Sequence, residues 1–203
     1  MKYFGGCDVG STYTKCVILD ENGKMVSDVT NRSKINPVQS AEIALNDAIS
    51  KVDGINSAEE LTYLIGTGYG RNKVPFADEN ISEISCHAMG VHVTNPSVKA
   101  IIDIGGQDVK GISIDTDGTV KNFAMNDKCA AGIQLAVAKR CFVMAKKAGA
   151  TDSITLTGGC AKNDGLKKAI EKVLKIKVVD LDTDPQLMGA LGAAEYARQK
   201  GMA

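Results

Sequence analysis

Two segments of the chain place an acidic residue, glycines and a lysine in the same order. One segment runs from Asp8 to Lys15 (DVGSTYTK), and the other runs from Asp103 to Lys110 (DIGGQDVK), 95 positions later. A glycine-rich turn exposes several backbone N–H groups in a concave row, which binds phosphate oxygens. Both segments therefore predict phosphate-binding turns, which could hold a polyphosphate from two sides.

The side chains of these segments add further chemistry for a nucleotide. A carboxylate at the head of such a turn usually holds Mg²⁺ through water, because Mg²⁺ keeps much of its hydration shell. We expect this role for Asp8 and Asp103, and we expect Asp8, Gln107 and Asp108 to be catalytic, with Gln107 or Asp108 orienting the attacking water. The predicted phosphate site comprises Asp8, Gly10, Ser11, Thr12, Tyr13, Thr14 and Lys15 in the first copy. In the second copy it comprises Asp103, Gly105, Gly106, Gln107 and Asp108.

The similarity between the two halves extends beyond these turns. Residues 64–70 (LIGTGYG) and 154–160 (ITLTGGC) form a second matching pair, 90 positions apart. An Asp-x-Gly sequence before a turn is common, so one copy alone would be interpreted as a plain hairpin. Two pairs in the same order instead indicate two copies of one α/β unit with the order βββαβα. Asn95-Pro96-Ser97 lies between the copies, which predicts subdomains at residues 1–96 and 97–203.

The spacing of apolar residues predicts the elements that follow these strands. We expect helices at residues 37–52, 130–148, 166–174 and 187–198, and a strand at residues 177–181. The last of these helices is rich in glycine and alanine. Such small residues more often reflect close packing of the helix than contact with a ligand.

A glycine pair in the second copy suits the adenosine part of a nucleotide. Gly158 and Gly159 follow a β-rich run, and glycines there let a flat ring approach the backbone. Asn163 and Gln186 are placed to complete such a pocket. The same glycines could instead form a plain strand-to-helix turn, and the sequence leaves both alternatives open.

The composition argues against several classes of partner. Lys and Arg number 24 and Asp and Glu number 24, so no net field favours nucleic acid or an anionic membrane. No apolar segment has the roughly 7–15 residues of a signal peptide or the ~20 residues of a membrane span. We therefore expect a cytoplasmic protein whose six cysteines are thiols. The two histidines, His87 and His92, are too isolated for a metal site, and we expect His87 to be a hydrogen-bonded core or interface residue.

Six segments together resemble the activators of 2-hydroxyacyl-CoA dehydratases, a family that includes the ATPase subunits of benzoyl-CoA reductase. The resemblance spans nearly the whole chain. It is carried by DVGSTYTK (8–15), GTGYGR (66–71), SEISCHAMG (82–90), DIGGQDVK (103–110), NDKCAAG (126–132) and TGGCAKN (157–163).

The resemblance implies the duplicated ribonuclease-H-like fold of actin, Hsp70 and the acetate and sugar kinases, with two subdomains around a cleft for ATP or ADP. It also implies a homodimer that works under anaerobic conditions and shares one [4Fe-4S] cluster between its two subunits. ATP hydrolysis would then drive one low-potential electron from the cluster to a 2-hydroxyacyl-CoA dehydratase or related reductase. Ferredoxin or flavodoxin would supply that electron.

Cys129, within NDKCAAG, matches one cluster ligand of the family. It precedes the predicted helix at 130–148, whose N-terminal dipole would stabilise a thiolate and an anionic cluster. Ala131, at the same helix start, could report on nucleotide phosphates.

The chain departs from the family after Gly132, because the stretch that holds the family's second cysteine is absent. Cys141 lies roughly 18 Å along the predicted helix at ~1.5 Å per residue, so it cannot replace that ligand. A cluster with incomplete protein ligation, a cluster shared with a different partner, and no cluster at all are all compatible with the sequence.

Two other functions fit the same phosphate turns. A small-molecule kinase of this fold would need a specificity pocket and a catalytic base near Asp103 or Asp108. A cluster-free nucleotide-sensing protein would keep the nucleotide site and assign Cys129 only a structural role.

Overall fold

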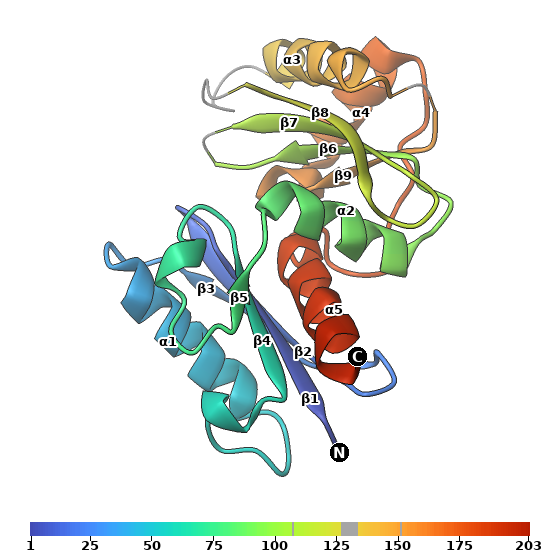
Figure 1. Ribbon diagram of the computed structural model, residues 1–203. Helices are drawn as coiled ribbons and strands as arrows, with labels where there is room; N and C mark the ends of the chain where they lie inside the picture. The colour runs from blue at the N-terminus through green and yellow to red at the C-terminus, as the bar shows by residue number, and fades with distance from the viewer. Residues whose placement is uncertain (107, 127–133, 151) are drawn as a thin grey trace. The chain divides into compact units, whose positions relative to one another are not determined.

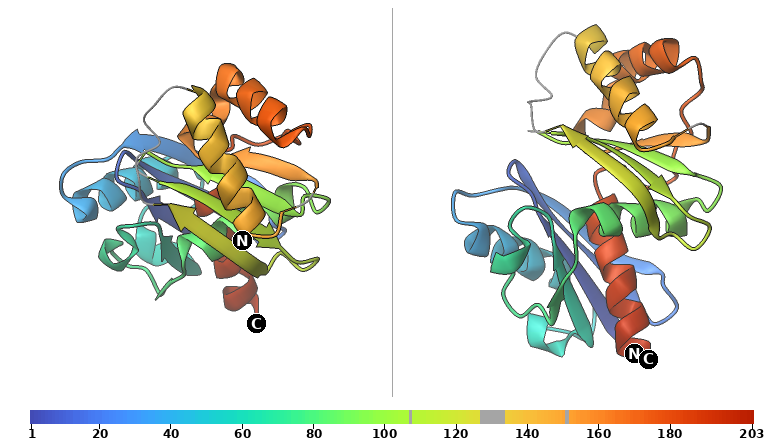
Figure 2. Two further views of the ribbon diagram at one scale, coloured as in Figure 1. Left: turned by 90° about the horizontal axis from the view of Figure 1, so that it is seen from above. Right: turned by 45° about the horizontal axis from the view of Figure 1, so that its top comes forward.

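The computed structural model describes all 203 residues except 107, 127–133 and 151 (Figures 1 and 2). By their internal contacts these residues form two units. The first unit contains Met1–Gly90 and Gly189–Ala203, and the second contains Val91–Met188. The last helix of the chain is thus grouped with the N-terminal residues, while the expected division at residue 96 stays a prediction.

The first unit is built on a five-stranded sheet with the order β3-β2-β1-β4-β5. β1 pairs antiparallel with β2 and parallel with β4, so it lies at the centre of the sheet. Six of its seven residues are buried, which explains why this strand carries apolar and small residues on both faces. The strands are β1 (Tyr3–Val9), β2 (Tyr13–Asp20), β3 (Met25–Arg32), β4 (Tyr63–Thr67) and β5 (Glu79–Asn80).

Helix α1 (Pro37–Ile49) covers one face of this sheet. Its apolar stripe joins Cys7 and Val9 of β1 in one buried cluster, together with Ala44 and Leu45 of the helix itself. The helix begins as the sequence predicts, because Oδ1 of Asn36 accepts a hydrogen bond of 3.0 Å from the Val38 amide. Proline follows the cap, where its missing N–H costs nothing.

Helices α2 (Glu83–Thr94) and α5 (Met188–Met202) supply the opposite layer of the first unit. Glycines let the elements of this layer approach closely. A methyl group at Gly6 would lie 2.1 Å from the Ala190 carbonyl oxygen, and one at Gly192 would lie 1.8 Å from the Cys86 carbonyl oxygen. The small residues of α5 therefore serve packing, as predicted from the sequence.

The second unit contains a four-stranded sheet with the order β8-β7-β6-β9. Helix α3 packs on one face, and a methyl group at Gly111 of β7 would lie 2.5 Å from the Met144 carbonyl oxygen of that helix (Figure 2). The strands are β6 (Ala100–Ile104), β7 (Val109–Ile114), β8 (Val120–Asn126) and β9 (Ile154–Thr157). The helices are α3 (Gln134–Lys147) and α4 (Asp164–Leu174), and short 3-10 turns lie at Ala58–Glu60, Arg71–Lys73 and Gly159–Lys162.

The two sheets repeat the same topology, which confirms the duplicated α/β fold. In each unit three antiparallel strands follow one another, and a fourth strand then adds parallel to the first. The predicted helices form with slightly shifted ends, although the part of the third helix before Gln134 lies outside the described residues.

The predicted strand at residues 177–181 is wrong. Among the described residues this segment makes one isolated bridge, between Val179 and Thr155. Side chains bind neighbouring backbone groups instead, since Glu171 accepts from the Val178 amide and the Thr155 hydroxyl donates to the Val179 carbonyl. The Val179 amide still donates to the Ile154 carbonyl at 2.8 Å, so the segment meets β9 at this one bridge.

The five described cysteines, Cys7, Cys16, Cys86, Cys141 and Cys160, are all free thiols. Within the described residues, no helix combines the length and apolar character that crossing a membrane requires.

Candidate nucleotide site

The first phosphate turn connects β1 to β2 and is closed by a hydrogen bond of 3.2 Å from the Gly10 amide to the Tyr13 carbonyl. A methyl group at Gly10 would lie 2.8 Å from that carbonyl oxygen, so the turn requires glycine. Ser33 supports the turn from β3's end, because its hydroxyl donates to the Gly10 carbonyl at 2.7 Å and lies 3.0 Å from the Thr14 hydroxyl. Thr14 is thus buried beneath the turn, with its hydroxyl against Ser33. The predicted phosphate ligands that are exposed are Ser11, Thr12 and Tyr13.

Asp8 and Lys15 face each other across the antiparallel pair of β1 and β2. Nζ of Lys15 donates to Oδ2 of Asp8 at 2.8 Å, and a methyl group at Gly10 would lie 3.6 Å from the same ammonium. The lysine charge therefore lies at the base of the phosphate turn. The Asp8 residue is only 5% exposed, so its carboxylate is held in a defined direction.

Two glycines make the space that the Asp8 carboxylate occupies. Gly68 has φ of +87°, and a methyl group on it would lie 2.3 Å from Oδ1 of Asp8. Gly189, near the start of α5, would place a methyl group 2.9 Å from Oδ2. Any larger residue at either position would have to displace the carboxylate. The 66–71 segment singled out in the sequence thus belongs to the Asp8 site.

The second unit repeats this arrangement around Asp103. The Gly105 amide donates to the Asp108 carbonyl at 3.1 Å, which closes the turn between β6 and β7. Oδ2 of Asp103 lies 3.3 Å from Nζ of Lys110, and Oδ1 accepts from the Thr157 hydroxyl at 2.8 Å. The predicted site residue Gly106 is exposed next to this turn, and Gln107 lies outside the described residues.

The two lysines differ in how their charge is compensated. Lys110 lies 2.8 Å from Asp108 and 3.3 Å from Asp103, and its side chain is 4% exposed. The Lys15 side chain is 14% exposed and faces the Asp8 carboxylate. The Lys110 ammonium is thus buried between two carboxylates, whereas the Lys15 side chain is more exposed to solvent. Asp108 is predicted to orient water, and in the structure its Oδ2 forms an ion pair with Lys110.

The predicted adenosine residues lie together in the second unit. Gly158 has φ of +81°, and its amide donates to the Pro185 carbonyl at 3.1 Å. A methyl group at Gly159 would lie 2.9 Å from Nε2 of Gln186, so these two distant residues are neighbours. Asn163 caps helix α4, with Oδ1 accepting from the Leu166 amide at 3.0 Å, which leaves its amide nitrogen for a ligand.

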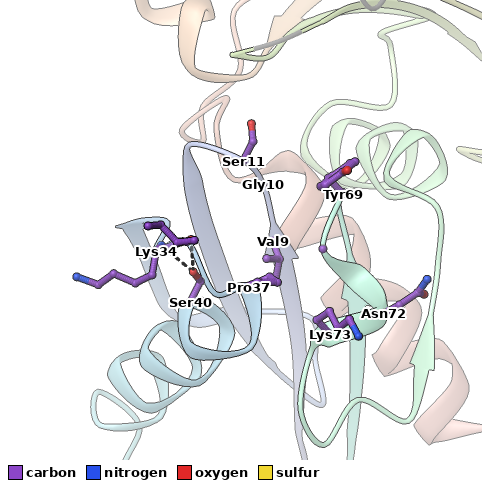
Figure 3. A pocket seen from close by; sticks show the side chains of 11 residues that line it. Val9, Gly10, Ser11, Lys34, Pro37, Ser40, Tyr69, Asn72 and Lys73 are labelled. Carbon is purple, nitrogen blue, oxygen red and sulfur yellow. Dashed lines mark hydrogen bonds between the residues drawn. The ribbon is translucent and has the colours of Figure 1, made fainter.

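A pocket of about 470 Å³ lies beside the first phosphate turn (Figure 3). Val9, Pro37 and Tyr69 give it apolar walls, and Lys34 and Lys73 are its charged lining residues. Its described lining contains no carboxylate and no imidazole that could act as a base. The remaining lining residues are Gly10, Ser11, Ile35, Ser40, Gly70 and Asn72.

Sequence reasoning missed several residues that the fold brings to these sites. Thr157 was quoted only as part of a motif, although its position 90 residues after Thr67 could have marked both as neighbours of the paired aspartates. No sequence signal connects Gly189 or His87 to Asp8. The predicted residues Cys129 and Ala131 lie outside the described part of the chain.

Asp8 offers one carboxylate, which suits Mg²⁺ held through its water molecules rather than by direct protein ligands. Oδ2 is held by Lys15, while Oδ1 occupies the place that a side chain at position 68 would take. Cys129, the expected ligand of an iron–sulfur cluster, lies outside the described residues. The described His, Cys, Asp and Glu residues include no group of three that could hold a metal. Four of the five described cysteines, Cys7, Cys16, Cys86 and Cys141, are buried.

Known proteins match this chain over almost its whole length. It is 33% identical to the "Activator of lactoyl-CoA dehydratase" of Anaerotignum propionicum, over 96% of this chain and 97% of the relative. It is also 33% identical to the "(R)-2-hydroxyglutaryl-CoA dehydratase activating ATPase" of Acidaminococcus fermentans, over 98% of both chains. The solved activator of the 2-hydroxyisocaproyl-CoA dehydratase from Clostridium difficile, with bound ADPNP, has a TM-score of 0.87 and 31% identity, over 98% of this chain and 96% of that one.

The alignments also reveal an internal difference. The two sequence alignments span 255 and 264 positions, whereas this chain has 203 residues, so both relatives contain residues that have no counterpart here. The model of the BadF/BadG/BcrA/BcrD ATPase family matches in two pieces, residues 6–133 and 131–197, which meet just after Cys129. With its duplicated actin-like fold and matches over nearly every residue, the chain belongs to the BadF/BadG/BcrA/BcrD ATPase family.

Proposed function

We propose that this protein is an ATP-hydrolysing activator that drives one-electron transfer to a 2-hydroxyacyl-CoA dehydratase or a related reductase. The observation that carries the proposal is the repeated glycine turn, one in each unit. Asp8 with Lys15 heads the first turn, and Asp103 with Lys110 heads the second. Its relatives at 33% identity are named as activators of such dehydratases, and one of them is named as an ATPase.

The first unit would bind phosphate oxygens through the exposed amides and hydroxyls of Ser11 and Thr12 and through the charge of Lys15. Mg²⁺ would neutralise phosphate charge and polarise the terminal phosphorus, and Asp8 would hold it through its water molecules. The carboxylate is suited to this role because the fold restrains it on both sides, at Gly68 and at Gly189.

The second unit carries the equivalent groups. Its turn at Gly105 and Gly106 would bind phosphate through backbone amides, and Asp103 would hold hydrated Mg²⁺ through water at the head of that turn. Gly158 and Gly159, with Gln186 beside them, leave room for the adenosine. Gln107 or Asp108 would orient the attacking water, and Ala131 would contact phosphate.

The redox part of the proposal depends on Cys129. By family resemblance it would ligate a [4Fe-4S] cluster shared in a homodimer, with ferredoxin or flavodoxin as donor. Four thiolates usually hold such a cluster, and Cys129 from two copies supplies two.

A second candidate function, a nucleotide-sensing protein without a cluster, is favoured by the break in the family match just after Cys129. A kinase has less support, because the relatives that match over nearly the whole chain are named as activators of dehydratases.

Anaerobic purification separates the two candidates. We expect a brown protein that contains iron and sulfide and hydrolyses ATP slowly, with faster turnover of a partner dehydratase when both proteins and ATP are present. Slow ATP hydrolysis by a colourless protein that takes up no iron on reconstitution would favour the nucleotide sensor. The variant Cys129→Ala should lose iron and partner activation together while it retains ATP hydrolysis.

A further inference from the structure

His87 lies next to the Asp8 carboxylate although no sequence pattern connects them. The residue belongs to α2 and is 7% exposed. A methyl group placed on Gly189 would lie 2.9 Å from Oδ2 of Asp8 and 3.1 Å from Nε2 of His87. The imidazole nitrogen and the carboxylate oxygen therefore border the same small space, and glycine at position 189 keeps that space open.

Close packing of α2 against α5 restrains the imidazole in this position. A methyl group at Gly192 would lie 1.8 Å from the carbonyl oxygen of Cys86, the residue before His87. The Cys86 side chain is fully buried in a cluster with Phe4 and Ala193. The helix turn that carries His87 is thus held by backbone contact on one side and by core packing on the other.

The surroundings of the two Asp8 oxygens differ. Oδ2 accepts from Lys15 at 2.8 Å, and Oδ2 and Nε2 of His87 border the same space at Gly189. Oδ1 instead lies over Gly68, the glycine with φ of +87°. Two nitrogen-bearing side chains, Lys15 and His87, thus lie on the Oδ2 side of the carboxylate.

We propose that His87 is a positioning residue for Asp8. Together with Lys15 it restrains Oδ2, so that Oδ1 keeps the direction needed to accept a hydrogen bond from Mg²⁺-bound water. The inference rests on the proposed ATPase function and adds a residue to its metal-binding step. A carboxylate that is free to rotate would bind hydrated Mg²⁺ less tightly, because part of the binding energy would be spent on fixing it.

Two conservative variants separate positioning from simple packing. The amide nitrogen of glutamine can reach the place of Nε2, whereas that of asparagine reaches only the place of Nδ1. We expect His87→Gln to keep the Mg²⁺ concentration for half-maximal ATPase activity within about threefold of the wild-type value. His87→Asn should raise that concentration about tenfold or more, which corresponds to about 1.4 kcal/mol of lost binding.

The control is His92→Gln, which changes the other histidine of the chain, on the same helix, and should leave the Mg²⁺ dependence unchanged. Gly189→Ala supplies a second variant, and it should raise the Mg²⁺ requirement as His87→Asn does because the new methyl group enters the shared space. Thermal unfolding of each variant shows that the fold is kept.

The outcomes are distinct. A wild-type protein without ATPase activity would defeat the proposed function itself and the role of His87 with it. An active wild type in which His87→Asn and His87→Gln have the same Mg²⁺ dependence would overturn the positioning role alone. A fall in melting temperature without any change in Mg²⁺ dependence would also overturn it, since that result describes a residue of the core.

Discussion

Thr157 donates a hydrogen bond of 2.8 Å from its hydroxyl to Oδ1 of Asp103, although 54 residues separate the two in the chain. The parallel pairing of β6 and β9 places them opposite each other. The same register places Thr67 opposite Asp8 in the first unit. Each phosphate turn therefore has beside its aspartate the last threonine of a strand far away in sequence, and in the second unit that threonine binds the carboxylate.

Replacing Thr157 tests the role of this bond. Thr157→Val keeps the shape and removes the bond to Asp103, which should cost about 1–2 kcal/mol of unfolding free energy and weaken ATP binding. Thr155→Val, on the same strand as Thr157, is the matched control. It removes a hydrogen bond of 2.7 Å from the buried Thr155 hydroxyl to the Val179 carbonyl. Urea unfolding and calorimetric titration with ATP measure both effects. Equal loss of ATP affinity in the two variants would contradict a specific role of Thr157.

Asp8→Asn should lower kcat of the ATPase by at least about 100-fold, because an amide holds hydrated Mg²⁺ poorly. It also removes the negative charge that faces Lys15, so the unfolding free energy should fall by about 1–3 kcal/mol. Asp28→Asn, an exposed position on β3, is the control and should change neither quantity. Steady-state ATPase rates with urea unfolding would check both, and full activity of the Asp8 variant would refute the assignment.

Gly68→Ala should abolish nucleotide binding. The substitution strains a backbone with φ of +87° and places a methyl group 2.3 Å from Oδ1 of Asp8. The strain alone costs about 1 kcal/mol, and the contact adds to it. Gly54→Ala isolates the strain, because Gly54 has φ of +94° and nothing within 4 Å of a new methyl group. Thermal shifts with and without Mg-ATP compare the two; an ATP-induced shift retained in the Gly68 variant would count against the site.

The buried thiol of Cys86 should make the protein less stable at high pH. Burial raises its pKa from 9.0 to about 12, so the folded state keeps a proton that the unfolded state releases. Stability is therefore fully present below pH 9 and falls as the pH rises towards 12. The slope should approach about 1.4 kcal/mol per pH unit for this thiol.

Urea unfolding at a series of alkaline pH values measures that slope. Cys86→Ala lowers stability at every pH but should make the decline shallower by the contribution of one thiol. Cys160→Ala serves as comparison, because Cys160 is only partly buried and the pKa of its thiol is raised less. An unchanged slope in the Cys86 variant would show that other groups cause the alkaline loss.

The sequence by itself determined the duplicated fold and the local chemistry of each turn. An aspartate and a lysine seven residues apart around a tight turn must face each other, because antiparallel register follows from the turn. The helix start at Asn36 and the packing role of the small residues in the last helix were predictable for the same local reasons.

Only the tertiary structure decided which distant residues surround those turns. Parallel pairing brought Thr157 to Asp103, and the approach of α2 to α5 brought His87 and Gly189 to Asp8. The predicted strand at 177–181 is reduced to one bridge, at which the Val179 amide binds the Ile154 carbonyl and the Thr155 hydroxyl binds the Val179 carbonyl. Such contacts join residues that are far apart along the chain, so no spacing or periodicity within a segment encodes them.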